Sequence, residues 1–106
     1  MKTIKKYNDF INEEFFFFGG GITPEYVEST FKRIIELLKR NGNVENETFN
    51  DKYLSLFYDN TYFQLSLVDR DDIVIVVEKN NITDILNQYP ITELGKIVNT
   101  IISYNK

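Results

Sequence analysis

Residues 53–78 read YLSLFYDNTYFQLSLVDRDDIVIVVE, and this stretch decides the fold that the sequence predicts. Apolar side chains alternate with polar ones, or run together as β-branched residues, in three segments at 53–58, 61–68 and 73–78. Such segments, separated by short turns rich in Asp and Asn, are typical of antiparallel strands. The sequence therefore predicts a three-stranded antiparallel meander.

The register of this meander follows from its turns. A two-residue turn at 59–60 places Leu56 opposite Phe63, and beyond the next turn we expect Leu67 to pair with Ile73. One face of the sheet is then aliphatic, and acidic residues stay out of it. The opposite, aromatic face carries five larger side chains: Tyr53, Phe57, Tyr62, Val74 and Val76.

The role of the aromatic face stays open between alternatives. If every helix packs on the aliphatic face, the aromatic face is exposed as a partner-binding surface, paired in a dimer, or covered by the Phe15–Phe18 run. If one helix crosses over, the same residues belong to an ordinary three-layer core. Monomers seldom leave an apolar patch of several hundred Å² bare without a role.

One helix is expected before the meander. Thr23 is a good N-cap, Pro24 suits the first helical position, and Asn41-Gly42 ends the pattern. The polar run at 43–50 is expected to be a loop. The apolar face of the helix recurs at helical spacing: Val27, Phe31, Ile34, Ile35 and Leu38.

Two helices are expected after the meander. Asn81 can cap a short helix that Pro90 ends, and a second helix is expected from about 91 to 104. The predicted fold class is thus α+β, with an N-terminal helix, a three-stranded antiparallel meander and two C-terminal helices. The short helix rests on four residues at helical spacing: Ile82, Ile85, Leu86 and Tyr89.

The first 21 residues, MKTIKKYNDFINEEFFFFGGG, are expected to form a flexible peptide arm before a single domain at 22–106. Four consecutive Phe cannot all point inward from one helix or strand, and three glycines favour a flexible tether. A short apolar segment of this kind folds when it docks on a partner. Its expected partner-binding residues are Tyr7, Phe10, Ile11, Phe15, Phe16, Phe17 and Phe18.

The composition lacks the side chains that enzymes use most often for catalysis. The 106 residues include no Cys and no His, which removes thiolate nucleophiles, the commonest general base and the commonest transition-metal ligand. We expect no catalytic residues, no cofactor and no metal site. A remote alternative is a carboxylate enzyme with magnesium or calcium at Asp69, Asp71 and Asp72, although this turn lacks the ligand spacing of a calcium-binding loop.

The charge distribution argues against direct binding of nucleic acid. The net charge is −4, and residues 43–106 carry ten acidic and five basic side chains, so no basic patch is visible. The basic start of the chain is followed by Asn, Asp and Glu, so no signal peptide is expected. The run of four Phe is too short to span a membrane. These features predict a cytoplasmic protein, whether of a host or of the gene's own cell, with no contact to membranes.

The N-terminus resembles a known targeting segment. Met1-Lys2-Thr3, an aromatic at Tyr7 and the run 9–13, DFINE, are similar to the capsid-targeting peptide of internal head proteins in T-even-like phages. The resemblance covers residues 1–14 and none of the domain. Two extra residues precede the aromatic, and Glu14 stands where a small residue is expected. The resemblance implies cargo delivered into an assembling phage head, with prohead protease cleavage after Glu13.

The leading hypothesis is a non-enzymatic, phage-type accessory protein that works by binding another protein, in the host cytoplasm or, as a virion-associated or head-packaged protein, in the virion. The partner would be a capsid or scaffold protein, with a homodimer as a further option. The alternative hypothesis is an acidic inhibitor of a host enzyme or defence complex, in which residues 43–106 occupy a basic groove. Steep weakening by salt would favour the inhibitor, because an apolar arm is insensitive to salt.

Overall fold

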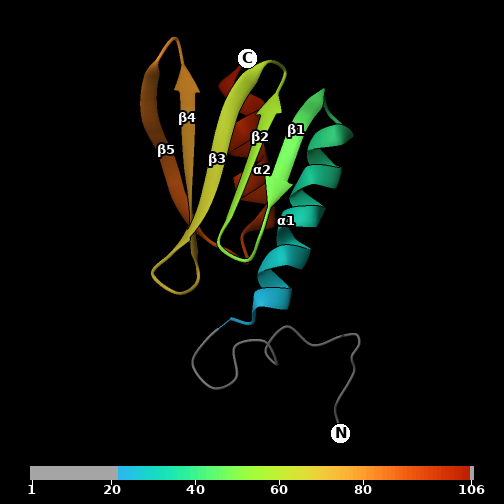
Figure 1. The fold of residues 1–106 in the computed structure, drawn as a ribbon, viewed down its shortest axis with the longest axis vertical. Coiled ribbons are helices and arrows are strands. Elements are labelled where there is room, and N and C mark those ends of the chain that lie inside the picture. The colour runs from blue at the N-terminus through green and yellow to red at the C-terminus, as the bar shows by residue number, and fades with distance from the viewer. Residues whose placement is uncertain (1–21, 106) are drawn as a thin grey trace, which may run out of the picture.

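The computed structural model of the chain describes residues 22–105, in which an antiparallel sheet carries two helices (Figure 1). The strands lie in the sheet in the order in which they follow along the chain. The α+β class is confirmed, but the predicted arrangement is wrong, since five strands and two helices replace three and three. The elements are α1 (Pro24–Lys39), β1 (Val44–Phe49), β2 (Tyr53–Tyr58), β3 (Thr61–Val68), β4 (Asp72–Lys79), β5 (Ile82–Pro90) and α2 (Leu94–Tyr104).

Helix α1 begins where the sequence predicts it. The Oγ1 atom of Thr23 accepts a hydrogen bond from the backbone N–H of Tyr26 at 3.1 Å, and Pro24 occupies the first helical turn. This cap satisfies one of the backbone donors that a helix N-terminus leaves without a partner. The apolar face is buried as expected, at Val27, Phe31, Ile34, Ile35 and Leu38.

The predicted pairing within the meander is confirmed. Leu56 lies opposite Phe63, and Leu67 lies opposite Ile73. At the turn between β2 and β3, Asp59 and Asn60 have φ values of 49° and 69°. Two positive φ values in a two-residue turn suit the right-handed twist of a hairpin, and Asn and Asp tolerate them better than most residues.

The predicted short helix at 82–89 is wrong, because these residues belong to strand β5. Asn80 and Asn81 have φ values of 56° and 66°, so they form a tight hairpin turn and Asn81 caps no helix. Strand β5 pairs with β4 along its whole length. Pro90 is tolerated at its end because β5 is an edge strand, where a missing backbone N–H costs no hydrogen bond of the sheet.

The predicted loop at 43–50 is also wrong, because residues 44–49 form strand β1 at the other edge. Its pairing with β2 is interrupted near Asn46, whose φ is 56°. An ion pair joins β1 to α1, with 2.9 Å between Lys39 Nζ and Glu47 Oε2. The hydrogen bond from Lys39 lowers the pKa of the Glu47 carboxyl.

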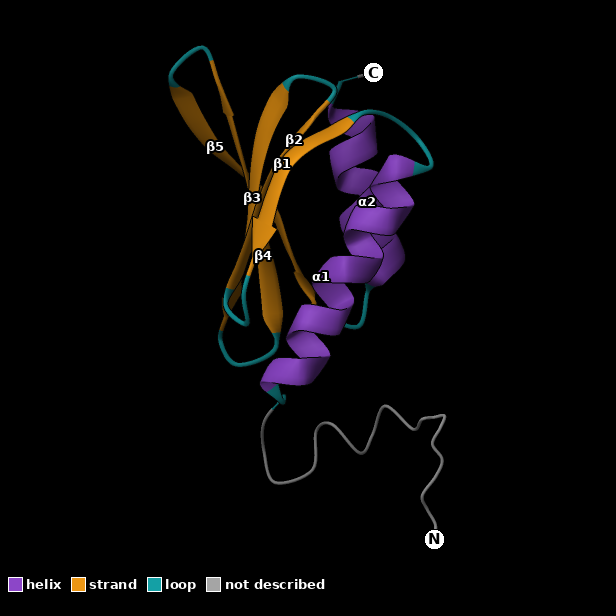
Figure 2. Cartoon of the chain, turned by 45° about the vertical axis from the view of Figure 1, so that its right-hand side comes forward, coloured by secondary structure: helices purple, strands orange, loops and turns teal. Residues whose placement is uncertain are grey.

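The last predicted helix is present as α2, although it begins at Leu94 and not near residue 91. Both helices lie on the same side of the sheet and contact each other (Figure 2). The core lies between this helix layer and the aliphatic face of the sheet. From the sheet it takes Leu54, Leu56, Phe63, Leu65, Ile73, Ile75 and Val77, and from α2 it takes Ile97, Val98 and Ile101.

Candidate functional site

The sheet face turned away from α1 and α2 is named the open face below. Among residues 22–105 no helix crosses to it (Figure 2), so the alternative of a three-layer core is wrong for this part of the chain. The pairing of the strands shows which residues lie on the open face. In the three central strands these are every second residue of 53–57 in β2, of 62–68 in β3 and of 72–78 in β4. In the edge strands they are residues 45 and 48 of β1 and residues 83, 85, 88 and 90 of β5.

The structure brings the predicted sheet-face residues together on the open face. Tyr53 is 42 % exposed, and the other four side chains are half-buried. Within residues 22–105 no helix lies over these side chains. The predicted arm residues Tyr7, Phe10, Ile11, Phe15, Phe16, Phe17 and Phe18 lie outside the described residues. The four half-buried residues are Phe57, Tyr62, Val74 and Val76.

An aromatic pair occupies one row of the open face. Phe57 and Tyr62 are direct cross-strand partners, with ring centroids 5.4 Å apart and planes inclined by 63°. Such edge-to-face contacts contribute about 0.5–1.5 kcal/mol beyond the area that they bury. An acidic residue lies opposite each member of the pair, Glu45 beside Phe57 and Glu78 beside Tyr62. Across the sheet the row therefore runs Glu45, Phe57, Tyr62, Glu78, with an acidic residue on each side of the aromatic pair.

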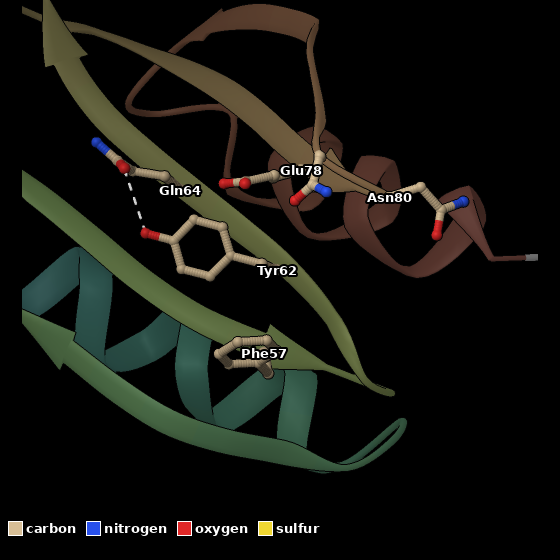
Figure 3. A pocket seen from close by; sticks show the side chains of 6 residues that line it. Phe57, Tyr62, Gln64, Glu78 and Asn80 are labelled. Carbon is tan, nitrogen blue, oxygen red and sulfur yellow. Dashed lines mark hydrogen bonds between the residues drawn. The ribbon is translucent and has the colours of Figure 1, made fainter.

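A shallow depression of about 440 Å³ opens beside this pair, toward the β4–β5 turn (Figure 3). The Tyr62 hydroxyl donates a hydrogen bond to Gln64 Oε1 at 3.3 Å, and Gln64 Nε2 donates to Ser66 Oγ at 3.4 Å. These bonds hold the amide in one orientation. Within residues 22–105 the Glu78 carboxylate makes no hydrogen bond or ion pair. The depression is lined by Phe57, Tyr62, Gln64, Glu78, Asn80 and Asn81.

The adjacent row adds an apolar residue that the sequence reasoning missed. Val76 of β4 lies opposite Ile85 of β5, and Ile85 is 72 % exposed. Ile82 is 63 % exposed near the tip of the hairpin, on the opposite side of the sheet. Asn tolerates positive φ, so the Asn80-Asn81 pair could have been read as a two-residue hairpin turn, and the resulting register places Ile85 opposite Val76 on the open face.

Two carboxylates at the acidic turn between β3 and β4 accept hydrogen bonds from a side chain of β5. The Nε2 atom of Gln88 donates hydrogen bonds to Asp72 Oδ2 at 2.8 Å and to Asp69 Oδ2 at 3.3 Å. Both carboxylates therefore accept a hydrogen bond that joins the turn to β5. In the part of the chain that the structure describes, no three potential metal ligands gather in a way that could hold an ion.

Neither helix between residues 22 and 105 is long and apolar enough to cross a membrane. Comparison of the chain with protein families, with curated proteins and with solved structures found no significant match. The function is therefore inferred from the fold and from the open face.

Proposed function

We propose that this protein works without catalysis, by binding another protein through the open face. One observation carries the proposal: both helices cover the same side of the sheet, while the other side presents aromatic and branched side chains. A folded monomer gains by burying such side chains, since covered apolar area is worth about 25 cal/mol per Å². A partner that covers this face would obtain that gain.

The area of the open face can be compared with the area that a stable protein interface buries. Five strands about 4.8 Å apart and about seven residues long span roughly 20 by 23 Å, or roughly 450 Å² in projection. A stable interface buries about 800 Å² on each partner. The open face alone is therefore at the small end for a stable interface, and a second contact would strengthen the binding. In our proposal residues 1–21 supply that contact, because they contain the apolar Phe15–Phe18 run.

The kind of partner is suggested by the N-terminal resemblance. A capsid or scaffold protein of a tailed phage fits the targeting segment that residues 1–14 resemble, and a host cytoplasm or a virion is then the place of action. A second copy of this chain is the other partner that the proposal allows. The open face would be the dimer interface in that case.

Site-specific photocrosslinking in the producing cells tests the proposal. A benzoyl-phenylalanine replaces Tyr53, which is an exposed aromatic residue of the open face. The matched control carries the same group at Lys32, which is exposed on α1. We expect one dominant crosslinked protein from position 53, identified by mass spectrometry and lost when Phe57→Asp and Val76→Asp place charge on the face. We expect deletion of residues 1–21 to weaken this crosslink and to leave circular dichroism unchanged.

Two outcomes contradict the proposal. The first is the absence of any crosslink from position 53, to another protein or to a second copy of the chain. The second is the same crosslinked protein at equal yield from position 32, since a protein captured from both sides is not held by the open face. Thermal unfolding of the double variant separates a lost interface from a lost fold.

A further inference from the structure

We propose that the depression beside the aromatic pair receives an arginine side chain of the partner protein. This inference rests on the proposed function and names the chemistry by which the open face recognises its partner. The guanidinium would lie against the Phe57–Tyr62 pair and would bind the carboxylate of Glu78 (Figure 3). Three observations support this site: an open depression, an aromatic pair that lines it, and a Glu78 carboxylate that makes no hydrogen bond or ion pair within residues 22–105.

The aromatic pair supplies the first part of the attraction. The ring of Tyr62 is half-buried, and its edge-to-face contact with Phe57 fixes its orientation on the sheet. A cation above an aromatic ring is attracted by the negative charge of the ring face, and arginine makes such contacts more often than lysine. The register places Glu78 directly opposite Tyr62. A guanidinium seated on the ring is thus within the reach of a carboxylate from the neighbouring strand.

The charge of the open face supplies the second part. The charged strand residues on it, within the described part of the chain, are the acids Glu45, Asp72 and Glu78. The next basic residue along β4, Lys79, lies on the other side of the sheet, where its Nζ atom is 6.0 Å from the centre of the Tyr104 ring. Other basic side chains lie on the helix side, at Lys32, Arg33 and Lys39 of α1 and at Arg40, its C-cap. A basic segment of a partner is therefore drawn to the open face.

The shape and the acceptors of the site favour arginine over lysine. A guanidinium is planar, stacks on aromatic rings and carries five N–H donors in a rigid fork, whereas an ammonium is compact and strongly hydrated. The site offers several oxygen acceptors. The Glu78 carboxylate supplies two, and the Oε1 atom of Gln64 keeps one lone pair beyond the bond from Tyr62. Asn80 and Asn81 also line the depression.

An NMR titration of the ¹⁵N-labelled full chain tests the inference with three tripeptide probes. Each probe is an acetylated and amidated glycine-X-glycine, in which X is arginine, lysine or citrulline. Citrulline has nearly the shape of arginine and no charge. We expect the arginine probe to shift the backbone amides of Tyr62, Gln64 and Glu78, with an affinity about fivefold above that of the citrulline probe. The lysine probe should fall between the two.

Variants of single carboxylates provide the matched comparison. Glu78→Gln removes the charge and keeps the shape, so it should weaken the arginine probe by about threefold to tenfold and leave the citrulline probe unchanged. Glu28→Gln makes the same change on the exposed surface of α1 and should alter neither. Tyr62→Leu removes the ring and should reduce the preference for arginine over lysine.

The results separate this inference from the proposed function. Equal affinity for the arginine and citrulline probes, or equal effects of Glu78→Gln and Glu28→Gln, would overturn the arginine site. A crosslinked partner at position 53 would in that case still support the open face as a binding surface. Arginine-selective shifts without any crosslinked protein would support the site and reject its use for a protein partner. The probe comparison needs only the wild-type chain, so a variant that unfolds does not leave the inference undecided.

Discussion

Replacing Gly42 by alanine should destabilise the fold, because the added Cβ has no room. An ideal Cβ at this position would lie 2.6 Å from Oη of Tyr58, 2.7 Å from its Cζ and 2.8 Å from its Cε1. These separations are far below normal van der Waals contact. Tyr58 is 2 % exposed and belongs to the core, so its ring cannot swing into solvent. Either the ring or the chain after α1 must shift.

The expected magnitude follows from the crowding. Overpacking a well-filled site costs about 1–3 kcal/mol, and for a domain of this size 1 kcal/mol moves the thermal midpoint by about 4–8 °C. The matched control is Gly95→Ala, since nothing lies within 4 Å of a Cβ at that position. Gly95 is exposed within α2, where alanine is the better helix former by up to about 1 kcal/mol. The same substitution should thus act with opposite signs at the two glycines.

Urea unfolding followed by circular dichroism measures both variants against the wild type. We expect Gly42→Ala to lower the midpoint and Gly95→Ala to raise it or leave it unchanged. Tyr58→Phe removes the Oη atom and leaves Cζ and Cε1 in place, so it should relieve part of the cost of Gly42→Ala in a double-mutant cycle. A Gly42→Ala protein as stable as the wild type would refute the reasoning, because Tyr58 would then not be packed against Gly42.

Two further predictions concern the cap of α1 and the same buried tyrosine. Thr23→Ala removes the side-chain acceptor of the Tyr26 N–H, although the Thr23 carbonyl remains as a second acceptor, and should cost about 1 kcal/mol in urea unfolding, whereas Thr23→Ser should keep most of the stability. Burial raises the pKa of the Tyr58 phenol, so the native state holds this proton more tightly than the unfolded chain does. That stability is present below about pH 10 and is lost as pH rises through the raised pKa, so Tyr58→Phe should flatten the decline of the unfolding free energy above pH 10. Equal slopes for the two proteins would contradict this assignment.

The central meander could be predicted because its local signals agree with one another. The turn residues at 59–60 accept positive φ, and the side chains that alternate on either side of them match in register. The five predicted residues of the open face follow from that register alone. Their exposure could not be predicted, because it depends on whether both helices pack on the same side of the sheet. The sequence of residues 53–78 does not determine this.

Strand β5 was mispredicted because a local pattern pointed the other way. Ile82, Ile85, Leu86 and Tyr89 recur at helical spacing, although the strand leaves Ile82 and Ile85 largely exposed. What decides the outcome is the free edge of β4, whose backbone groups the residues after the Asn80-Asn81 turn can pair at once. Such an edge is invisible to periodicity in the segment itself.

Strand β1 was mispredicted for a related reason. Residues 44–49 read as polar, with Val44 and Phe49 as the only apolar side chains. The strand exists because its backbone pairs with β2 and because α1 holds it from the side through Lys39 and Glu47. Neither interaction leaves a mark in the hydrophobic pattern. The depression beside Glu78 was not predicted either. A single acidic residue at the end of a strand has the same sequence pattern as an ordinary solvent-exposed surface residue.

The placement of both helices on one side of the sheet has a consequence for folding during synthesis. Each strand pairs with the one made just before it, so the sheet can extend hairpin by hairpin as the chain emerges from the ribosome. Its aliphatic face cannot be fully covered at that stage, because α2 follows all five strands along the chain. Until residues 94–104 arrive, α1 alone shields the growing sheet. The nascent chain therefore passes through a state with exposed apolar surface, which is the state that chaperones bind.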